Sequence, residues 1–358
     1  MFYSSAPARV CLFGEHQDYL QLKVIPAAIN LRLEITSNLI EKNIVKIFSQ
    51  ELNEITKIRT DINKFEAKKG SLTSYLEAGI LALKRFKQET VIPSISVTIK
   101  SQIPIASGLS SSAALLVAWI QHLSGIVELD LNNRTIAELA YDAEHNFLGI
   151  PCGRMDQYAS SFGGIFSLTC TEKPTLTNLK APKIGLIVVN SQTPKLTSNV
   201  HGEKVTQIQQ VVNKFEQTHQ MNLEDITSEF LQKVKTKIKQ NEHTILEGVI
   251  SIKENTLMAE KELSKSDPDI EQIGQLLTSQ HEFLKNNIQV SLPVLDNIVK
   301  TGIDCGALGG KLTGAGLGGS VFLLTSREND KVVERIQNNL KLPTYSVKID
   351  RGAYFKEI

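Results

Sequence analysis

The stretch Pro104–Ala114, PIASGLSSSAA, decides the fold because it joins an alternating strand pattern to a long apolar segment. Upstream of it, Ile95, Val97 and Ile99 alternate with polar residues, which is the period of a half-buried strand. Downstream, Ala113–Ile120 reads AALLVAWI and predicts a helix that is buried on most sides. The run of small residues therefore lies where a strand ends and a buried helix begins.

Such a junction is suited to binding a phosphate group. The first backbone N–H groups of a helix have no partner within the helix, and the helix dipole is positive at this end. Small serines and Gly108 let phosphate oxygens approach that backbone directly. Taken alone, GLSSS is equally compatible with a serine that caps a helix after a glycine turn. Two further segments favour the phosphate loop.

The first of these segments is Ala6–Tyr19, APARVCLFGEHQDY. It places four polar side chains around a short apolar run, namely Arg9, Glu15, His16 and Asp18. Such a cluster can hydrogen-bond several hydroxyls of a polyol, while its cation stabilises a developing alkoxide. A solvated loop with a satisfied histidine is the other interpretation.

The second segment is Gly309–Gly319, GGKLTGAGLGG, which the apolar string SVFLLT of a buried strand follows. Its six glycines in eleven residues let a ligand approach the backbone closely, although a glycine-rich turn between strands is a competing interpretation. The chain contains no GxxxxGK[ST] string of a Walker A loop, and the spacing does not fit GxGxxG followed by a distant acid. Walker-type and Rossmann sites are therefore poor fits.

In this order and spacing, the three segments resemble the signature motifs of the GHMP small-molecule kinases, a family that includes galactokinases and mevalonate kinases. The similarity is greatest to galactokinases, through the strings RVCLFGEHQDY, AEHNFLGIPCGRMDQYASSFG, VVNSQTPKL and VSLPVLDNIV. The resemblance implies an α+β fold of two domains. Residues 1–180 are expected to resemble domain 2 of ribosomal protein S5 and residues 181–358 to be ferredoxin-like, with the active site in the cleft between them.

The resemblance implies transfer of the γ-phosphate of ATP to the anomeric hydroxyl of galactose or a closely related hexose. Asp156 is then the catalytic base and Arg9 the cation that favours the alkoxide, in a reaction that needs positioning and charge neutralisation. The expected sugar contacts are Glu15, His16, Asp18, Gly153 and His201. The expected ATP contacts are Ser107, Gly108, Leu109, Ser110, Ser111, Ser112, Gly314, Ala315 and Gly316. Ser112 and Glu144 are expected to hold Mg²⁺, a hard cation that prefers oxygen ligands.

Several positions depart from the galactokinase pattern and leave the sugar open. Ala8 and Cys11 replace a usual glycine and asparagine, and Leu20–Lys23 replaces the usual Asn-Gly-Gly. Arg154 replaces an apolar residue beside the expected base, where it could bind a substrate carboxylate or point to solvent. Lys311 could add a charge near the phosphates or be an ordinary surface residue. Galactose is the first expectation, with galacturonate, an N-acetylated galactosamine and another hexose as rivals.

Two other functions stay open. A mevalonate kinase shares the GEH string and the serine loop, but it usually carries lysine in place of Arg9 and lacks the DY that follows here. A non-catalytic regulator of the same fold would bind sugar and ATP without turnover. Such a protein needs no general base, so the presence of Asp156 together with Arg9, Glu144 and Ser112 argues against it.

Composition fits a globular enzyme. The 358 residues, 41% of them hydrophobic, can bury a large core, and the formal net charge of +1 gives no general attraction to nucleic acid or acidic membranes. No apolar run is long enough to span a membrane, and the first residues lack the apolar region of a signal peptide, so we expect a cytoplasmic protein. Four cysteines without a CxxC pair fit reduced thiols. The expected partner is a small-molecule sugar, and the expected state is a monomer or weak homodimer.

Overall fold

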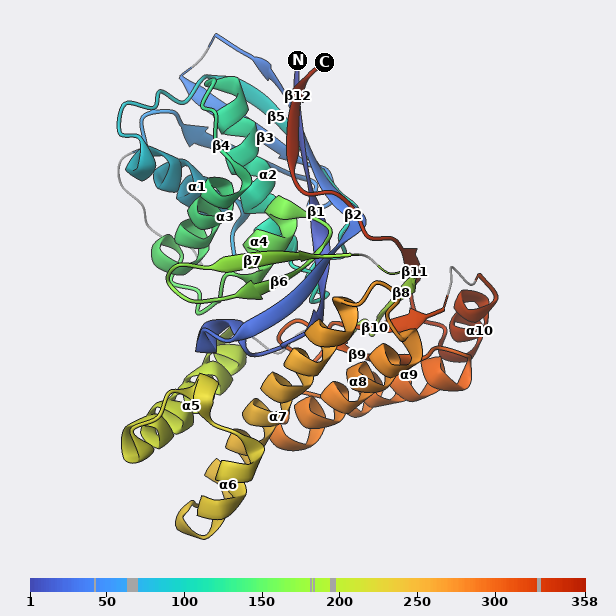
Figure 1. The fold of residues 1–358 in the computed structure, drawn as a ribbon. Helices are drawn as coiled ribbons and strands as arrows, with labels where there is room; N and C mark the ends of the chain where they lie inside the picture. The colour runs from blue at the N-terminus through green and yellow to red at the C-terminus, as the bar shows by residue number, and fades with distance from the viewer. Residues whose placement is uncertain (42, 63–69, 181, 183, 194–197, 327–329) are drawn as a thin grey trace.

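The computed structural model describes residues 1–41, 43–62, 70–180, 182, 184–193, 198–326 and 330–358, with the backbone alone at 198–201. These residues fold into two α+β domains, each built on one sheet with helices packed against it (Figure 1). The strand and the buried helix that flank the phosphate loop are β5 (Ile95–Ser101) and α2 (Ser111–Ile126), as the sequence predicts. Within the described residues, no helix is both long and apolar enough to cross a membrane.

The first sheet contains β5 and seven other strands. They are β1 (Phe2–Phe13), β2 (Lys23–Leu39), β3 (Ile44–Ser49), β4 (Glu54–Arg59), β6 (Ile165–Thr169), β7 (Thr175–Leu179) and β12 (Tyr354–Glu357). The main order is β12-β1-β2-β5-β3-β4, and β6 pairs with β2 and β7. All pairs are antiparallel except β3 with β5. The last strand of the chain therefore returns to the domain in which the chain begins.

Helices of the first domain carry the phosphate loop and the expected catalytic residues. Besides α2, they are α1 (Leu72–Phe86), α3 (Asn133–Asp142) and α4 (Met155–Phe162). Helix α2 packs against β1 and β2 and is buried along most of its length, because its apolar residues are not confined to one face. Helix α3 continues into a π-helical turn, Ala143–Phe147, which contains Glu144. A π-helical turn inside a helix is a frequent feature of functional sites.

The second sheet is ferredoxin-like, as expected. Its strands are β8 (Gly185–Asn190), β9 (Gly309–Thr313), β10 (Ser320–Thr325) and β11 (Thr344–Val347). They lie in the order β11-β8-β10-β9, and every pair is antiparallel. The helices are α5 (Ser198–His219), α6 (Ser228–Val234), α7 (Gln240–Leu263), α8 (Ile270–Phe283), α9 (Pro293–Asp304) and α10 (Asp330–Leu340). Helices α8 and α9 pack against β9, whereas α5 and α6 extend away from this sheet (Figure 1).

The two domains are joined by a shared apolar core. Along β10, Phe322 and Leu324 belong to the core of the first domain, whereas Val321 and Leu323 belong to the core of the second. This alternation is that of a strand covered on both faces. The second sheet therefore lies directly on the first domain, and β12 adds a further link by pairing with β1 (Figure 1). The boundary between residues 180 and 181 stays a prediction.

Candidate active site

One cavity of about 260 Å³ lies where the phosphate loop, the Ala6–Tyr19 segment, the start of α4 and the glycine-rich segment meet. Most residues expected from sequence line it. They are Arg9, Glu15, His16, Asp18, Ser107, Gly108, Ser110, Ser111, Ser112, Glu144, Gly153, Asp156, Gly314 and Ala315. Leu109 and Gly316 adjoin lining residues without lining the cavity, and the side chain of His201 lies outside the described residues. Both domains thus contribute to one site.

A bidentate ion pair links the first strand to α4. Arg9 donates from Nε and Nη2 to the two oxygens of Asp156, at 2.7 and 2.8 Å. Its Nη1 donates to the carbonyl oxygen of Gly108 at 2.6 Å, and Ser110 Oγ donates to Asp156 Oδ2 at 2.5 Å. Burial lowers the pKa of Arg9, but the carboxylates of Asp156 and Glu15 more than offset this and raise it overall. Arg9 is therefore a permanent cation that ties the carboxylate to the phosphate loop.

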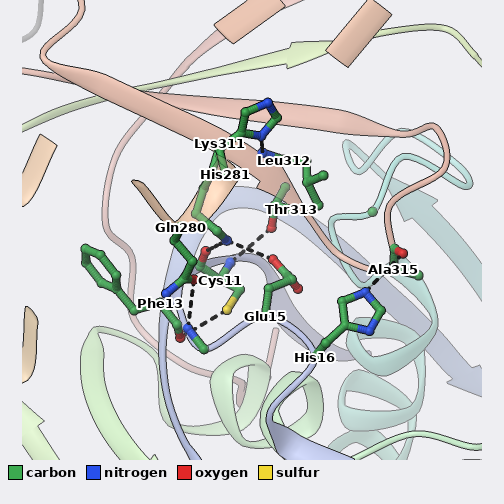
Figure 2. Close-up of polar contacts among 12 residues, drawn as sticks. Cys11, Phe13, Glu15, His16, Gln280, His281, Lys311, Leu312, Thr313 and Ala315 are labelled. Carbon is green, nitrogen blue, oxygen red and sulfur yellow. Dashed lines mark hydrogen bonds and ion pairs between the residues drawn. The ribbon is translucent and has the colours of Figure 1, made fainter. Parts of the chain in front are cut away.

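Two side chains of the Ala6–Tyr19 segment, Glu15 and His16, each contact a residue of the second domain. Glu15 Oε2 accepts a hydrogen bond from Lys311 Nζ at 3.0 Å. His16 Nε2 lies 3.2 Å from the carbonyl oxygen of Ala315 (Figure 2). Its Nδ1 lies 2.9 Å from the hydroxyl of Tyr19, within the same segment. Because a carbonyl oxygen can only accept, Nε2 is the donor in the contact with Ala315. Glu15 and His16 are both buried and have fixed orientations at the edge of the cavity.

Asp18 packs tightly against the chain that leads into α4. A Cβ atom at Gly153 would lie 2.3 Å from Asp18 Oδ2, so any side chain at that position would displace Asp18. Burial raises the pKa of Asp18 to about 7, and the nearby carboxylates of Asp156 and Glu15 act in the same direction. Asp18 can therefore exchange a proton near neutral pH and hydrogen-bond a hydroxyl in either protonation state.

Glu144 is a second buried acid at the cavity, on the π-helical turn. Gln157 Nε2 donates to Glu144 Oε2 at 2.7 Å. Burial raises the pKa of Glu144 to about 7, a hydrogen bond with Ser112 opposes this, and the charge of Asp156 adds to it. Within the described ranges, no group of three or more His, Cys, Asp and Glu residues could hold a metal ion. A cation at Glu144 and Ser112 would therefore need further oxygen ligands from a bound substrate or from water.

The backbone around the cavity adopts conformations that side chains disfavour. His16, Ala106 and Ser110 have φ values of +61°, +54° and +63°. Gly314 has φ +83°, and a Cβ atom there would lie 2.7 Å from the carbonyl oxygen of Gly108. The glycine-rich segment thus packs directly on the phosphate loop. Strain of this kind persists where the surrounding structure enforces it and is concentrated at functional sites.

Arg154 and Lys311, which the sequence left open, have definite partners. Arg154 donates from Nε to Glu138 at 3.1 Å, lies 4.2 Å from the ring centre of Tyr141, and does not line the cavity of about 260 Å³. Lys311 is fully buried rather than at the surface, and it binds Glu15. Lys311 therefore acts on the Ala6–Tyr19 segment and not at the phosphate loop.

Two polar residues of the site were not predicted from the sequence. Tyr19 lines the cavity and orients His16, and Gln157 binds Glu144 while its own Oε1 is buried without a hydrogen-bond partner in the described part of the chain. The signal for Gln157 is its place directly after Asp156 in the first turn of α4.

Comparison with protein families agrees with this site. The GHMP kinases N terminal domain matches residues 74–164, the GHMP kinases C terminal domain matches 259–342, and the galactokinase galactose-binding signature matches 1–36. The first match contains the phosphate loop and Asp156, the second the glycine-rich segment, and the third Arg9 and the acids of the Ala6–Tyr19 segment.

Known proteins resemble the chain over nearly its whole length. The galactokinase of Thermococcus kodakarensis is 30% identical over 89% of this chain and 88% of that protein. The galactokinase of Thermosipho africanus is 30% identical over 93% of this chain and 92% of that protein. The crystal structure of Lactococcus lactis galactokinase complexed with galactose has a TM-score of 0.86 at 24% identity, covering 98% of this chain and 94% of that one. Methanococcus jannaschii mevalonate kinase shares the fold, with a TM-score of 0.75 at 23% identity and 98% coverage of both chains. The chain therefore belongs to the GHMP kinase family, within its galactokinase group.

Proposed function

We propose that this chain transfers the γ-phosphate of ATP to the anomeric hydroxyl of galactose or a closely related hexose. GHMP kinases use ATP as phosphate donor, and membership of the galactokinase group makes the chain a phosphotransferase with an alcohol acceptor. The observation that carries the proposal is the Arg9–Asp156 pair, which shares one cavity with the phosphate loop and with Glu15, His16 and Asp18. A fixed cation and a carboxylate thus lie beside both a place for phosphates and a place for hydroxyls.

In the proposed reaction Asp156 accepts the proton of the anomeric hydroxyl as the oxygen attacks the γ-phosphorus. The bond between that phosphorus and the β-phosphate oxygen breaks, and ADP leaves with the electron pair. Arg9 and Ser110 bind Asp156 at its two oxygens and so fix the orientation of the carboxylate before substrate arrives. Arg9 also stabilises the negative charge that develops on the attacking oxygen.

The ATP phosphates are assigned to the residues of the serine loop, Ser107 to Ser112, and to Gly314, Ala315 and Gly316. The long helix α2 begins at Ser111, so its unpaired N–H groups and its dipole favour an anion there. Mg²⁺ is assigned to Ser112 and Glu144, because a buried carboxyl with a pKa near 7 can lose its proton to a cation. When bound there, Mg²⁺ would supply positive charge that neutralises part of the negative charge of the nucleotide phosphates.

The sugar is assigned to the opposite part of the cavity. Glu15, His16 and Asp18 would bind its hydroxyls, and Gly153 would present backbone groups. His201 lies near the position where galactokinases usually carry a tyrosine, and it stays an expected sugar contact. Two findings support galactose: the galactokinase galactose-binding signature covers residues 1–36, and the similar Lactococcus lactis enzyme was crystallised with galactose.

A coupled ADP-release assay tests the proposal directly. The protein and MgATP are incubated in parallel with galactose, galacturonate, N-acetylgalactosamine, glucose, arabinose, fucose and mevalonate. Rapid turnover with galactose alone is the expected result. Preference for an acidic or N-acetylated sugar would keep the kinase mechanism and replace the substrate. Sugar binding without turnover on any compound would contradict catalysis and favour a regulator.

We further propose a cytoplasmic protein that acts as a monomer or weak homodimer, with no nucleic-acid or membrane partner. Cys11, Cys152, Cys170 and Cys305 are all free thiols, which fits a reducing compartment. The near-neutral charge gives no electrostatic attraction to polyanions. Sedimentation at several protein concentrations tests the oligomeric state.

A further inference from the structure

We infer that Lys311 is a positioning residue that holds the Glu15 carboxylate toward the sugar from across the domain interface. The inference deepens the proposed function and rests on it, because it requires Glu15 to contact the sugar. Glu15 lies in the first domain and Lys311 in β9 of the second, 296 residues further along the chain. Positioning of this kind is separate from the role of Arg9, which itself lines the cavity.

Alternation along β9 explains how the lysine reaches the interface. Leu312 belongs to the core of the second domain. Since successive side chains of a strand point to opposite faces, Lys311 and Thr313 project toward the first domain. Lys311 also pairs in register with Phe322 of β10, and Phe322 belongs to the core of the first domain. The position of Lys311 thus follows from the register of the second sheet.

The environment of Lys311 satisfies a fully buried ammonium group. Its Nζ donates to the carbonyl oxygen of Cys11 at 2.9 Å and to Glu15 Oε2 at 3.0 Å (Figure 2). It also lies 5.4 Å from the ring centre of Phe322. The exposed fraction of the side chain is 0% for Lys311 and 3% for Glu15. A buried charge is tolerated when it is paired and hydrogen-bonded, and removing one partner leaves the other uncompensated. The pair is therefore a strong orientational restraint.

Lys311 binds Glu15 from the side away from the cavity. Glu15 lines the cavity, whereas Lys311 does not. Among the groups that the structure describes, Glu15 Oε1 has no hydrogen-bond partner, and Oε2 is the oxygen used by the lysine. One oxygen is thus anchored and the other is left for a substrate hydroxyl. Fixing the carboxylate in advance avoids ordering a flexible side chain at the moment of binding.

Neighbouring contacts supply a matched control. Thr313 Oγ1 accepts from the backbone N–H of Cys11 at 3.0 Å, and Gln280 Oε1 accepts from the backbone N–H of Gly14 at 3.0 Å (Figure 2). Both contacts cross the same interface and hold the backbone of the Ala6–Tyr19 segment. Neither reaches the carboxylate of Glu15. Thr313→Val therefore weakens the interface without releasing Glu15.

The test measures kcat and KM for galactose and for its 2-, 3-, 4- and 6-deoxy analogues, which all keep the anomeric hydroxyl. The proteins compared are the wild type, Lys311→Met, Glu15→Gln, Thr313→Val and the double variant of Lys311 and Glu15. We expect Lys311→Met to lower kcat/KM for galactose about 100-fold, mainly through KM, with KM for ATP unchanged. In the wild type, one deoxy sugar should have a lower kcat/KM than galactose because it lacks the hydroxyl that Glu15 binds. Lys311→Met and Glu15→Gln should both abolish this difference for that same sugar. The double variant should have a kcat/KM for galactose no lower than that of either single variant. Thr313→Val should lower Tm while keeping that discrimination.

Two results would overturn the inference: unchanged constants in Lys311→Met, or a uniform loss over all deoxy sugars like that of a general folding defect. Failure of the proposed function looks different, because the wild type would then turn over no sugar. In that case the inference is tested by calorimetry, which measures galactose binding to the wild type and to both single variants. Binding lost in both Lys311→Met and Glu15→Gln supports the inference, and binding retained in Lys311→Met contradicts it.

Discussion

Arg9 and Lys311 are two buried cations that reach carboxylates at the same cavity from different sides. Arg9 lies in the cavity wall, binds both oxygens of Asp156 and also contacts the phosphate loop. Lys311 lies behind the wall and binds one oxygen of Glu15. Asp18 is bonded to no cation among the described residues, and its pKa is raised to about 7 by burial.

This difference separates the acids of the cavity by what they can do. A carboxylate with a cation beside it in the cavity can respond to charge that develops during a reaction. A carboxylate anchored from behind is a fixed hydrogen-bond acceptor. An acid without a bonded cation titrates near neutral pH and couples the site to protonation. Variants that each remove one of these features distinguish the three roles.

The largest effect is expected for Asp156→Asn, which keeps the shape of the side chain and removes its charge. We expect kcat to fall about 1,000-fold or more, because a general base contributes about 100- to 10,000-fold. ADP release measures kcat, and nucleotide binding measured by calorimetry should stay near the wild-type value. Turnover close to that of the wild type would remove Asp156 from the mechanism.

A smaller loss is expected for Gly153→Ala. The new methyl group would lie 2.3 Å from Asp18 Oδ2, so Asp18 must move out of place. We expect kcat/KM for the sugar to fall about 100-fold, mostly through KM. Gly202→Ala is the matched control, because a Cβ atom there would come no closer than 3.8 Å to a neighbour. Equal effects of the two variants would contradict the role given to the Asp18 contact.

The protonation of Asp18 should appear in the pH dependence of stability. Its folded-state pKa of about 7 lies above the value of about 3.9 in an unfolded chain. As pH rises from about 4 to about 7, the unfolded chain loses this proton first, so the folded state is progressively destabilised, and the loss is complete above pH 7.

We therefore expect the wild type to have a lower Tm at pH 8 than at pH 5.5, with Asp18 contributing about 2 to 4 °C of the difference. Asp18→Asn should reduce the difference without removing it, because Glu144 also has a pKa raised to about 7 by burial. Calorimetry at the two pH values measures both proteins. The same pH difference in the variant and the wild type would contradict a protonated Asp18.

Local strings in the sequence predict most of the cavity, because most of its residues come from short contiguous motifs. The phosphate loop and the Ala6–Tyr19 segment each place several lining residues within a few positions of one another. The strand before the phosphate loop follows from the alternation of apolar and polar residues, and the helix after it follows from the length of the apolar run. The two-domain α+β fold was predicted because those motifs resemble a known family, and the family comparisons confirm it.

Contacts between distant segments are what the sequence leaves out. The period of two puts Lys311 and Thr313 on one face of a strand, but it does not say what covers that face. The partner, Glu15, is 296 residues away. The π-helical turn at Glu144 depends on a shift of backbone hydrogen bonds that no composition signals. Likewise, the return of β12 to β1 depends on the packing of both domains.

Arg154 is the departure from the family pattern for which the smallest effect is expected. It borders a hollow of about 280 Å³ that also includes Asp18 and Gly153, but its guanidinium already has Glu138 and the ring of Tyr141 as partners. We expect Arg154→Ile to cost about 1 kcal/mol or less of stability and to leave the ranking of sugars unchanged in the ADP-release assay. Glu138→Gln weakens the Arg154–Glu138 pair by removing the negative charge, and it should likewise leave the ranking of sugars unchanged. The contrary outcome requires a wild type that phosphorylates galacturonate. If Arg154→Ile loses that activity and Glu138→Gln keeps it, the arginine binds the carboxylate of the substrate, because that function needs the cation and not its partner Glu138.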